Sequence, residues 1–275
     1  MARTRDENLP HVSPLMWRWF TAYGRRFLRR HVHAVRVMRG GEPPTDLAPD
    51  EPLIFCCNHP SWWDPMVAMF LAQHFWPDRR HYWPIDAAML AKYRFFAKLG
   101  FFGVQAGTRR GAATFLRAAG GVLARDRSAL WVTAQGEFTD VRARPVLVKP
   151  GIEHLARWLG RGVIVPVAAE YVFWSERTPE ALVRFGRPIR ISDVPTTAVL
   201  EAALTETLDA LAAGSIARDP RKYVTLLGGS AGTSAIYDGW QRLRALAARK
   251  PFQPAHLPEA AGPNDAAAGL PARSG

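Results

Sequence analysis

Apolar side chains recur at the spacing of an α-helix through most of the first forty residues. On a helical wheel of residues 13–38, one side carries four arginines and the opposite side is apolar. The arginines are Arg18, Arg25, Arg29 and Arg36, and the apolar residues are Met16, Phe20, Tyr23, Phe27, Ala34 and Met38. Ser13 and Pro14 are a good helix start, and Gly40 with Gly41 is a stop. The pattern predicts one basic amphipathic helix over 13–38.

After a linker around Pro43 and Pro44, short apolar runs alternate with segments of helical periodicity. The apolar runs predict strands at 53–57, 81–85, 102–105, 129–133, 163–174 and 181–189. The intervening segments predict helices at 60–74, 87–98, 114–125, 151–159, 197–213 and roughly 233–249. This alternation indicates an α/β fold, and a short polar turn between the last two strands makes the central sheet mixed.

The pattern divides the chain into three parts. Residues 1–42 contain the amphipathic helix, and residues 43–250 are expected to form a single α/β domain with helices on the sheet. The last part, 251–275, is rich in Pro, Ala and Gly and has no apolar periodicity, which predicts a disordered tail. A chain of 275 residues fits one such domain with extensions.

Charge and cysteine content narrow the range of partners and compartments. The formal net charge is +12 and 48% of the residues are hydrophobic, so a folded basic protein is expected. Such a protein attracts an anionic membrane, a nucleic acid or a phosphorylated substrate. The only cysteines, Cys56 and Cys57, are adjacent, which disfavours a disulfide and favours a reducing compartment. The sequence shows no zinc-ligand spacing, no secretory signal and no apolar run of the roughly 18 residues that span a membrane.

The basic helix has two interpretations. Trp17 and Trp19 flank its apolar side, and the first forty residues hold nine arginines against only Asp6 and Glu7. This composition is typical of a helix that lies among lipid headgroups. The pattern equally fits a helix that packs on the protein's own core with its arginines in solvent, and both interpretations can hold together. Because the arginines form one stripe, without interleaved base-stacking aromatics, nucleic acid is the less favoured partner.

Polar residues follow the apolar run at 53–57, in the stretch Asn58-His59-Pro60-Ser61-Trp62-Trp63-Asp64. Pro60 suits a first helical turn, which places His59 at the cap of the next helix. The Asp64 carboxylate is expected to reach one imidazole nitrogen and to leave the other free to accept a proton from a hydroxyl. Capping alone also explains a histidine and an aspartate at this spacing, so these residues by themselves leave catalysis and capping open.

The same stretch resembles the His-x4-Asp motif of the glycerophosphate and lysophospholipid acyltransferase superfamily. Three further blocks of that superfamily follow in its order within about residues 50–190. The segment 103–109 resembles the second block, Gln135-Gly136-Glu137 the third, and 163–167, a buried strand with Pro166, the fourth. Lys149-Pro150-Gly151 is similar to a Lys-x-Gly turn of the superfamily.

The resemblance implies an O-acyltransferase similar to 1-acylglycerol-3-phosphate acyltransferases. Such an enzyme moves a fatty acyl group from acyl-CoA or acyl carrier protein to a hydroxyl of a lysophospholipid, glycerophosphate or related lipid. His59 is implied as the general base and Asp64 as the residue that orients it. The implied acceptor- or phosphate-binding residues are Arg109, Gln135, Gly136 and Glu137, and the implied supporting residues are Asn58, Lys149 and Pro166. Arg110 joins Arg109 after a glycine-rich turn, where the two guanidinium groups form either a phosphate fork or a solvated pair that opens the next helix. No metal and no tightly bound cofactor is implied, and the expected location is the cytoplasmic face of a membrane, as a peripheral protein.

Two positions depart from the pattern of the superfamily. Ala106 stands where its second block usually has an aromatic residue, and Gln135 stands where its third block begins with glutamate. An amide forms hydrogen bonds but does not accept a proton as a carboxylate does. The acceptor and the donor are therefore left open, and two rival interpretations remain: a non-catalytic basic lipid- or nucleic-acid-binding protein, and an acyltransferase fold with a degenerate site.

A hydrolase pattern near the end of the chain is interpreted as a coincidence. Residues 228–232 fit G-x-S-x-G, but that nucleophile turn requires an acid and then a histidine downstream, and too little chain follows for such a fold. The glycines are expected to form a loop before a last helix.

Overall fold

The structure is a computed structural model that describes residues 9–230. Its elements are α1 (Pro14–His31), β1 (Ala34–Met38), β2 (Leu53–Cys57), α2 (Asp64–Phe75), β3 (Arg80–Asp86), α3 (Ala87–Lys92), the 3₁₀ helix η1 (Arg94–Leu99), β4 (Phe101–Val104), α4 (Arg109–Leu123), β5 (Ser128–Thr133), α5 (Gly151–Leu159), β6 (Val163–Val172), β7 (Glu180–Phe185), β8 (Ile189–Arg190), η2 (Ile191–Asp193), α6 (Thr197–Ala217), η3 (Pro220–Lys222) and β9 (Tyr223–Gly228).

The strands form one mixed sheet in the order β4-β3-β5-β2-β6-β7-β1-β9, with β8 paired to β6. Strand β2 lies in parallel between β5 and β6, and β3 and β4 continue the parallel half. Strand β7 is antiparallel to β6, and β9 is antiparallel to β1. The α/β fold with a mixed sheet, predicted from the alternation of elements, is confirmed.

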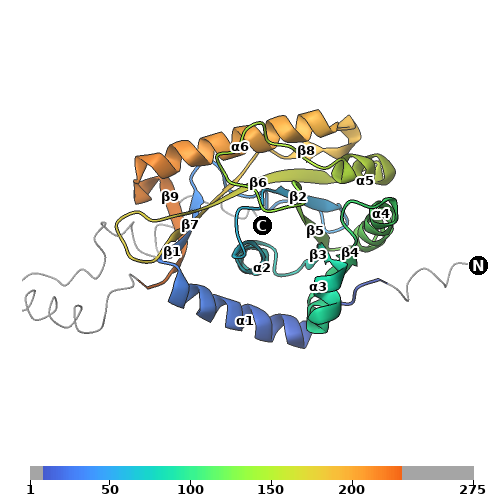
Figure 1. The fold of residues 1–275 in the computed structure, drawn as a ribbon, viewed down its shortest axis with the longest axis horizontal. Helices are drawn as coiled ribbons and strands as arrows, with labels where there is room; N and C mark the ends of the chain where they lie inside the picture. Colours follow the sequence, from blue (N-terminus) through green and yellow to red (C-terminus); the bar gives the residue numbers. More distant parts are fainter. Residues whose placement is uncertain (1–8, 231–275) are drawn as a thin grey trace, which may run out of the picture.

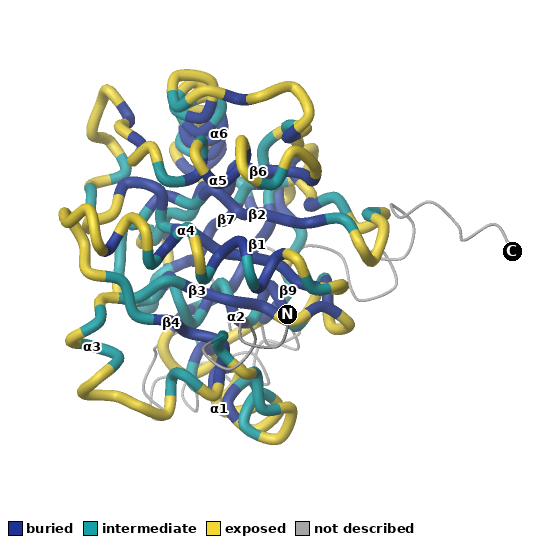
Figure 2. Tube along the Cα trace, turned by 90° about the vertical axis from the view of Figure 1, so that its right-hand side faces the viewer, coloured by how far each residue is buried: buried dark blue, intermediate teal, exposed yellow. Residues whose placement is uncertain are grey.

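Helices cover both faces of this sheet (Figure 1). Alternate residues of β2 serve the two sides: Ile54 and Cys56 pack in the core that contains residues of α4, α5 and α6, whereas Leu53 and Phe55 pack in the core that contains residues of α1 and α2. Figure 2 shows the strands as an almost continuously buried layer between the helices. Because both faces of the strands are buried, the run at 53–57 is apolar without alternation.

The prediction of one helix over residues 13–38 is wrong in its second half. Ser13 caps α1 as predicted, but α1 ends at His31, and β1 enters the sheet between β7 and β9. Arg36 therefore does not belong to the basic stripe of the helix. Its side chain is buried, and its Nε lies 2.8 Å from Glu180 Oε2. The extended backbone at Val32, followed by two alternating valines, favours the strand once partners are available.

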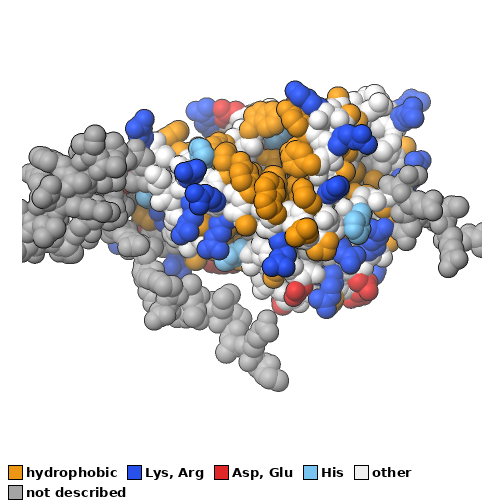
Figure 3. Space-filling model, turned by 90° about the horizontal axis from the view of Figure 1, so that it is seen from below, with side chains coloured by type: hydrophobic (Ala, Val, Ile, Leu, Met, Phe, Trp, Pro, Cys, Tyr) orange, Lys and Arg blue, Asp and Glu red, His pale blue; other side chains and the backbone are white. Residues whose placement is uncertain are grey.

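Helix α1 packs on the protein and also exposes an apolar face. Phe20, Gly24 and Leu28 are its buried residues. Gly24 allows close contact with α2, because a Cβ there would lie 2.6 Å from Met66 Sδ. On the outside, Leu15 is 78% exposed and Trp19 is 61% exposed. Figure 3 shows apolar side chains gathered in the middle of the lower face, with Lys and Arg beside them. Packing on the core is confirmed, and membrane contact stays a prediction.

Several element boundaries differ from those predicted. Helix α2 begins at Asp64 rather than Pro60, and α4 begins at Arg109, several residues before the predicted start at 114. Strand β9 was not predicted, and Gly228 is its last residue rather than part of a loop. The predicted helix at 233–249 and the predicted tail at 251–275 lie outside the described residues.

Candidate active site

The candidate site lies where the parallel strands β2 and β5 end beside β6, which continues to Val172. In the register of the sheet, Cys57 of β2 is paired with Thr133 of β5 on one side and with Val167 of β6 on the other. The residues that follow β2 and β5 therefore emerge at the same edge of the sheet. This arrangement brings the His59 loop beside the loop that begins with Gln135.

The Asp64 carboxylate is held by three donors. His59 Nδ1 lies 2.7 Å from Asp64 Oδ2, and the Ser61 backbone N–H donates to the same oxygen at 3.1 Å. The hydroxyl of Tyr171, on β6, donates to Asp64 Oδ1 at 2.8 Å. Burial, then the neighbouring carboxylate, raises the pKa of Tyr171 well above its ordinary value, so this hydroxyl remains a donor. The predicted contact between His59 and Asp64 is confirmed.

The backbone of His59 is fixed by the loop that follows β5. Its N–H donates to Gln135 Oε1 at 3.2 Å, and its carbonyl accepts from the Thr139 N–H at 2.9 Å. The ring of Phe138 stacks on the imidazole, with 4.1 Å between ring centroids. The tautomer that donates Nδ1–H to the carboxylate leaves Nε2 as a lone-pair acceptor. Nε2 makes no hydrogen bond within residues 9–230, so it is available to a substrate hydroxyl.

Asn58 ties β2 to β6 directly beside the histidine. Its Nδ2 donates to the Ala169 carbonyl at 2.9 Å, and its Oδ1 accepts from the Ala169 N–H at 2.8 Å. This two-way bond, with an Asn58 side chain that is almost fully buried, holds the end of β2 against β6. Asn58 thereby fixes the place from which the His59 loop departs.

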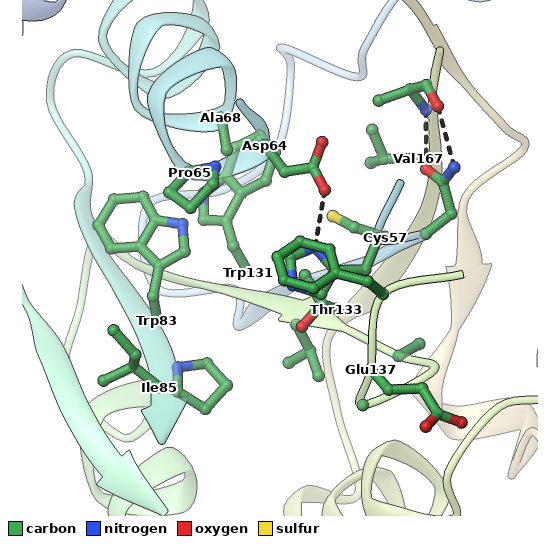
Figure 4. Close-up of a pocket in the computed structure, with 18 of the residues that line it drawn as sticks. Cys57, Asp64, Pro65, Ala68, Trp83, Ile85, Trp131, Thr133, Glu137 and Val167 are labelled. Carbon is green, nitrogen blue, oxygen red and sulfur yellow. Dashed lines mark hydrogen bonds and ion pairs between the residues drawn. The ribbon is translucent and has the colours of Figure 1, made fainter. Parts of the chain in front are cut away.

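A cavity of about 620 Å³ adjoins the histidine. His59, Asp64 and Tyr171 line it together with the loop residues Gly136 and Glu137. Most of its remaining wall is apolar and comes from α2, α3, β3 and β4, including Val67, Leu71, Trp83, Ile85, Met89 and Phe101. Figure 4 shows Trp83 and Ile85 on the side of the cavity opposite Glu137. The volume is within the range of about 300–1,000 Å³ that is usual for ligand pockets.

The remaining candidate residues lie in different positions. Lys149 lines the cavity, whereas Gln135, Arg109 and Arg110 do not. Gln135 is buried behind the loop, where its amide oxygen supports the His59 backbone, and the two arginines are exposed in the first turn of α4. The Gly136 N–H donates to the Thr133 carbonyl at 3.0 Å, so it is already occupied. Pro166 lies within β6, in register with Cys56.

The expected capping role of His59 is wrong. Helix α2 begins at Asp64 with Pro65 in its first turn, so the histidine lies in an irregular loop before the helix. Pro60 is part of that loop and starts no helix. The histidine caps no helix, yet four contacts hold it, from Asp64, Gln135, Phe138 and Thr139, so the surrounding structure fixes its position.

Sequence reasoning missed Tyr171 and Phe138. Tyr171 lies 107 residues from Asp64, and nothing local in the sequence signals their contact. Phe138 directly follows Gln135-Gly136-Glu137, and an aromatic residue beside this block is the signal that the sequence offered. In the structure its side chain is exposed.

Cys57 also lines the cavity, as an unpaired thiol. Burial, then the neighbouring Cys56 and the Asp64 carboxylate, raises the pKa of Cys57 well above its ordinary value. A protonated thiol is a poor nucleophile, so His59 is the better candidate for chemistry here.

Within 9–230, no three His, Cys, Asp or Glu side chains lie together as a metal site would require. None of the helices in this range combines the length and apolar character needed to cross a membrane.

Comparison with known proteins identifies the family to which the chain belongs. No curated protein matched the sequence. Among solved structures, the chain is similar to the 1-acyl-sn-glycerophosphate (LPA) acyltransferase PlsC from Thermotoga maritima, with a TM-score of 0.48 and 12% identity over 72% of this chain and 79% of that chain. The sequence model of the acyltransferase family matches residues 9–170, more than half of the 275 residues. The chain therefore belongs to the acyltransferase family.

Proposed function

We propose that this protein transfers a fatty acyl group from an acyl thioester to a hydroxyl of a lipid acceptor, with His59 as the general base. The single observation that carries the proposal is the state of the imidazole. Nδ1 is bound to a carboxylate that two other donors hold, while Nε2 is unoccupied in a residue that lines an apolar cavity. This is the arrangement of a base and the group that orients it.

The proposed reaction converts a thioester and a hydroxyl into an ester and a thiol. His59 Nε2 takes the hydroxyl proton of the acceptor while that oxygen attacks the carbonyl carbon of the thioester. The tetrahedral intermediate then expels the thiolate as the C–S bond breaks, and the imidazolium returns its proton to the sulfur. Asp64 stabilises the imidazolium through Nδ1 and does not itself take the proton. The products are an ester and a free thiol.

The negative oxygen of the intermediate needs a donor near His59. Gly136 does not supply it, because its N–H is bound to Thr133. The next amide, that of Glu137, belongs to a cavity-lining residue and makes no hydrogen bond within the described part of the chain. We assign the oxyanion contact to the Glu137 N–H, in place of the Gln135 and Gly136 predicted from the sequence.

The apolar wall supports a long acyl chain as the transferred group. Residues of α2, β3 and α3 extend the cavity away from His59 with almost no polar atoms, and Trp83 and Met89 are among them. Hydrocarbon gains free energy in such a wall, at roughly 25 cal/mol per Å² of buried apolar area. A fatty acyl thioester therefore fits better than an acetyl group. Acyl-CoA and acyl carrier protein both present this thioester.

The acceptor is proposed to reach the site from an anionic membrane surface. The outer face of α1 carries Trp19 stacked on Tyr23, with ring centroids 6.0 Å apart, and several exposed arginines beside them. Phe95 of η1 extends this apolar face, since its ring lies 6.1 Å from that of Phe20. Aromatic residues insert among headgroups and arginines attract anionic lipid. Replacing Trp19 with Ala should weaken sedimentation with anionic vesicles, most clearly at low salt.

The experiment that tests the activity measures thiol release from palmitoyl-CoA. Wild type and His59→Ala are compared with lysophosphatidic acid, other lysophospholipids and monoacylglycerol as acceptors. General-base catalysis contributes about 10²–10⁴-fold, so a loss in that range is expected in the variant. Circular dichroism and the melting temperature should be unchanged, because the His59 side chain is partly exposed and caps no helix.

Each outcome decides between interpretations. Acceptor-dependent release that disappears in His59→Ala supports the proposal. Full activity in the variant would overturn the assignment of the base. Absence of release with every acceptor, from palmitoyl-CoA and from palmitoyl carrier protein alike, would favour the non-catalytic interpretation.

A further inference from the structure

Acidic side chains outnumber basic ones in the wall of the cavity. Three carboxylates line it, from Asp64, Asp86 and Glu137. Asp64 is bound to His59 and Tyr171, and Asp86 caps α3 by accepting from the N–H groups of Ala88 and Met89. Only one Lys or Arg side chain of the described residues lines the cavity, and it is Lys149. A substrate with a negative group therefore meets a single permanent cation in this wall.

The ammonium of Lys149 is available to bind a negative group of a substrate. No carboxylate of residues 9–230 forms an ion pair with Lys149, which is exposed at the cavity wall. Its backbone is fixed, because its N–H donates to the Ala134 carbonyl at 2.8 Å. The cation is thus attached to the same loop that supports His59.

Gly136 shapes the path of this lysine. A Cβ on Gly136 would lie 3.2 Å from Lys149 Cγ and 3.3 Å from Lys149 Cε. The side chain of Lys149 therefore runs across the face of Gly136. With its φ of +74°, Gly136 occupies a conformation that other residues rarely adopt. One glycine thus provides both the turn and the space over which the lysine lies.

The two arginines predicted to bind phosphate are placed elsewhere. Arg109 and Arg110 are exposed and do not line the cavity, although Phe115 of the same helix does. Because neither arginine is in the wall, Lys149 is the basic residue of the cavity that a negative group of a substrate beside His59 could contact.

We propose that Lys149 binds a phosphate group of the substrate beside His59, and that Gly136 is required to admit the lysine side chain. The proposal rests on the proposed acyl transfer and deepens it by assigning a phosphate-bearing substrate to this wall. The phosphate comes from an acceptor such as a lysophosphatidate or from the CoA portion of the donor. A lysine ammonium suits either source, because it binds phosphate as a compact point charge.

The test compares substrates that bear phosphate with analogues that lack it. Palmitoyl-CoA is compared with the palmitoyl thioester of N-acetylcysteamine, and lysophosphatidic acid is compared with monoacylglycerol. The variant is Lys149→Met, which removes the ammonium and keeps an unbranched apolar stem. The matched control is Lys222→Met, at an exposed lysine outside the cavity. Arg109→Met tests the competing assignment.

We expect Lys149→Met to lower kcat/KM by about 10- to 100-fold for the phosphate-bearing member of one pair, the loss typical of a charged hydrogen bond. The partner without phosphate should change less than about threefold, as should both pairs in Lys222→Met. The pair that responds identifies the source of the phosphate. Equal losses for all four substrates, or a phosphate-selective loss in Arg109→Met and none in Lys149→Met, would overturn the proposal.

A binding measurement separates this proposal from the proposed function. Trp62, Trp83 and Trp131 line the cavity, so tryptophan fluorescence reports occupancy without turnover. In a His59→Ala background, Lys149→Met should weaken binding of palmitoyl-CoA or lysophosphatidic acid about tenfold or more and leave the two phosphate-free ligands unchanged. This result would support the phosphate site even in a protein that transfers no acyl group, and its absence would remove the site even from an active enzyme.

Discussion

Two buried polar pairs in this molecule resemble each other in chemistry and differ in what surrounds them. Arg36 and Glu180 form an ion pair on the β1, β7 and β9 side of the sheet, with Arg36 Nε 2.8 Å from Glu180 Oε2. His59 and Asp64 form a pair at the end of β2, at 2.7 Å. The Arg36 and Glu180 side chains are 7% and 1% exposed, whereas the His59 side chain is 18% exposed and lines the cavity.

The difference lies in what each pair leaves unbound. The Arg36 guanidinium also reaches the hydroxyl of Thr225, and neither Arg36 nor Glu180 lines the cavity. Glu180 Oε1 has no hydrogen-bond partner, but it is buried inside the protein, 3.8 Å from His33 Nε2. In the other pair, Asp64 is fully bound while His59 keeps one nitrogen open. A pair whose unbound atom is buried away from the cavity serves the fold, and a pair whose unbound atom faces the cavity can serve a reaction.

The largest expected effect breaks the pair of Arg36 and Glu180. Arg36→Met leaves the buried Glu180 carboxylate with only His33 beside it, whose Nε2 lies 3.8 Å from Glu180 Oε1. Breaking a buried ion pair typically costs about 3–5 kcal/mol of unfolding free energy. Urea denaturation measures this change. The double variant Arg36→Met with Glu180→Leu should recover much of the loss, because no uncompensated charge remains. A single variant as stable as the wild type would show that the pair is not desolvated.

The second effect acts on the open pair. Asp64→Asn removes the charge that stabilises protonated His59, so kcat should fall by about 100-fold or more, with a small change in stability. Steady-state rates and a melting curve on the same preparation separate the two effects. Asp86→Asn is the matched control, because this carboxylate lines the same cavity but caps α3, and asparagine caps equally well. A kcat for Asp64→Asn within threefold of the wild type would contradict the comparison.

The smallest effect sharpens the role of Tyr171. Tyr171→Phe removes one of three donors to Asp64, and a hydrogen bond to a charged group contributes about 1.5–3 kcal/mol. Because the carboxylate keeps its other two donors, one of which is His59, only part of this free energy is expected to reach the transition state. The expected decrease in kcat is therefore about 2- to 12-fold, with KM unchanged. Because the raised pKa keeps the phenol protonated, the alkaline side of the pH–rate profile should be the same in the variant. A loss as large as that of Asp64→Asn would show that the hydroxyl takes part in the reaction itself.

The sequence predicted the local half of this picture. The apolar run at 53–57, the break after it and the spacing of His59 and Asp64 are all contained in a dozen residues, and each corresponds to an observed feature. The start of α1 at Ser13 was equally local, since a serine followed by proline is a sufficient cap. Where the determining contact lies within a turn or two of the chain, pattern reasoning was adequate.

The errors have a common physical cause. Residues 34–38 form a strand because β7 and β9 supply partners about 145 and 190 residues away, and helical periodicity in a short apolar segment carries no information about them. Arg36 was counted with the surface arginines for the same reason, since Glu180 is 144 residues distant. Tyr171, which was not predicted, likewise reaches the site through the sheet, 107 residues from Asp64. Long-range pairing decided each of these positions.

Cys57 places an unreactive thiol in the wall of the cavity. Under the proposed function, a Cys57 thiolate would exchange with the thioester substrate and trap the acyl chain on the protein. The raised pKa of Cys57 keeps the sulfur protonated, and burial together with the neighbouring Asp64 carboxylate maintains this state. The aspartate that orients the histidine thus also suppresses a competing nucleophile at the end of the same strand. It follows that maleimide and iodoacetamide should label this protein only slowly at neutral pH.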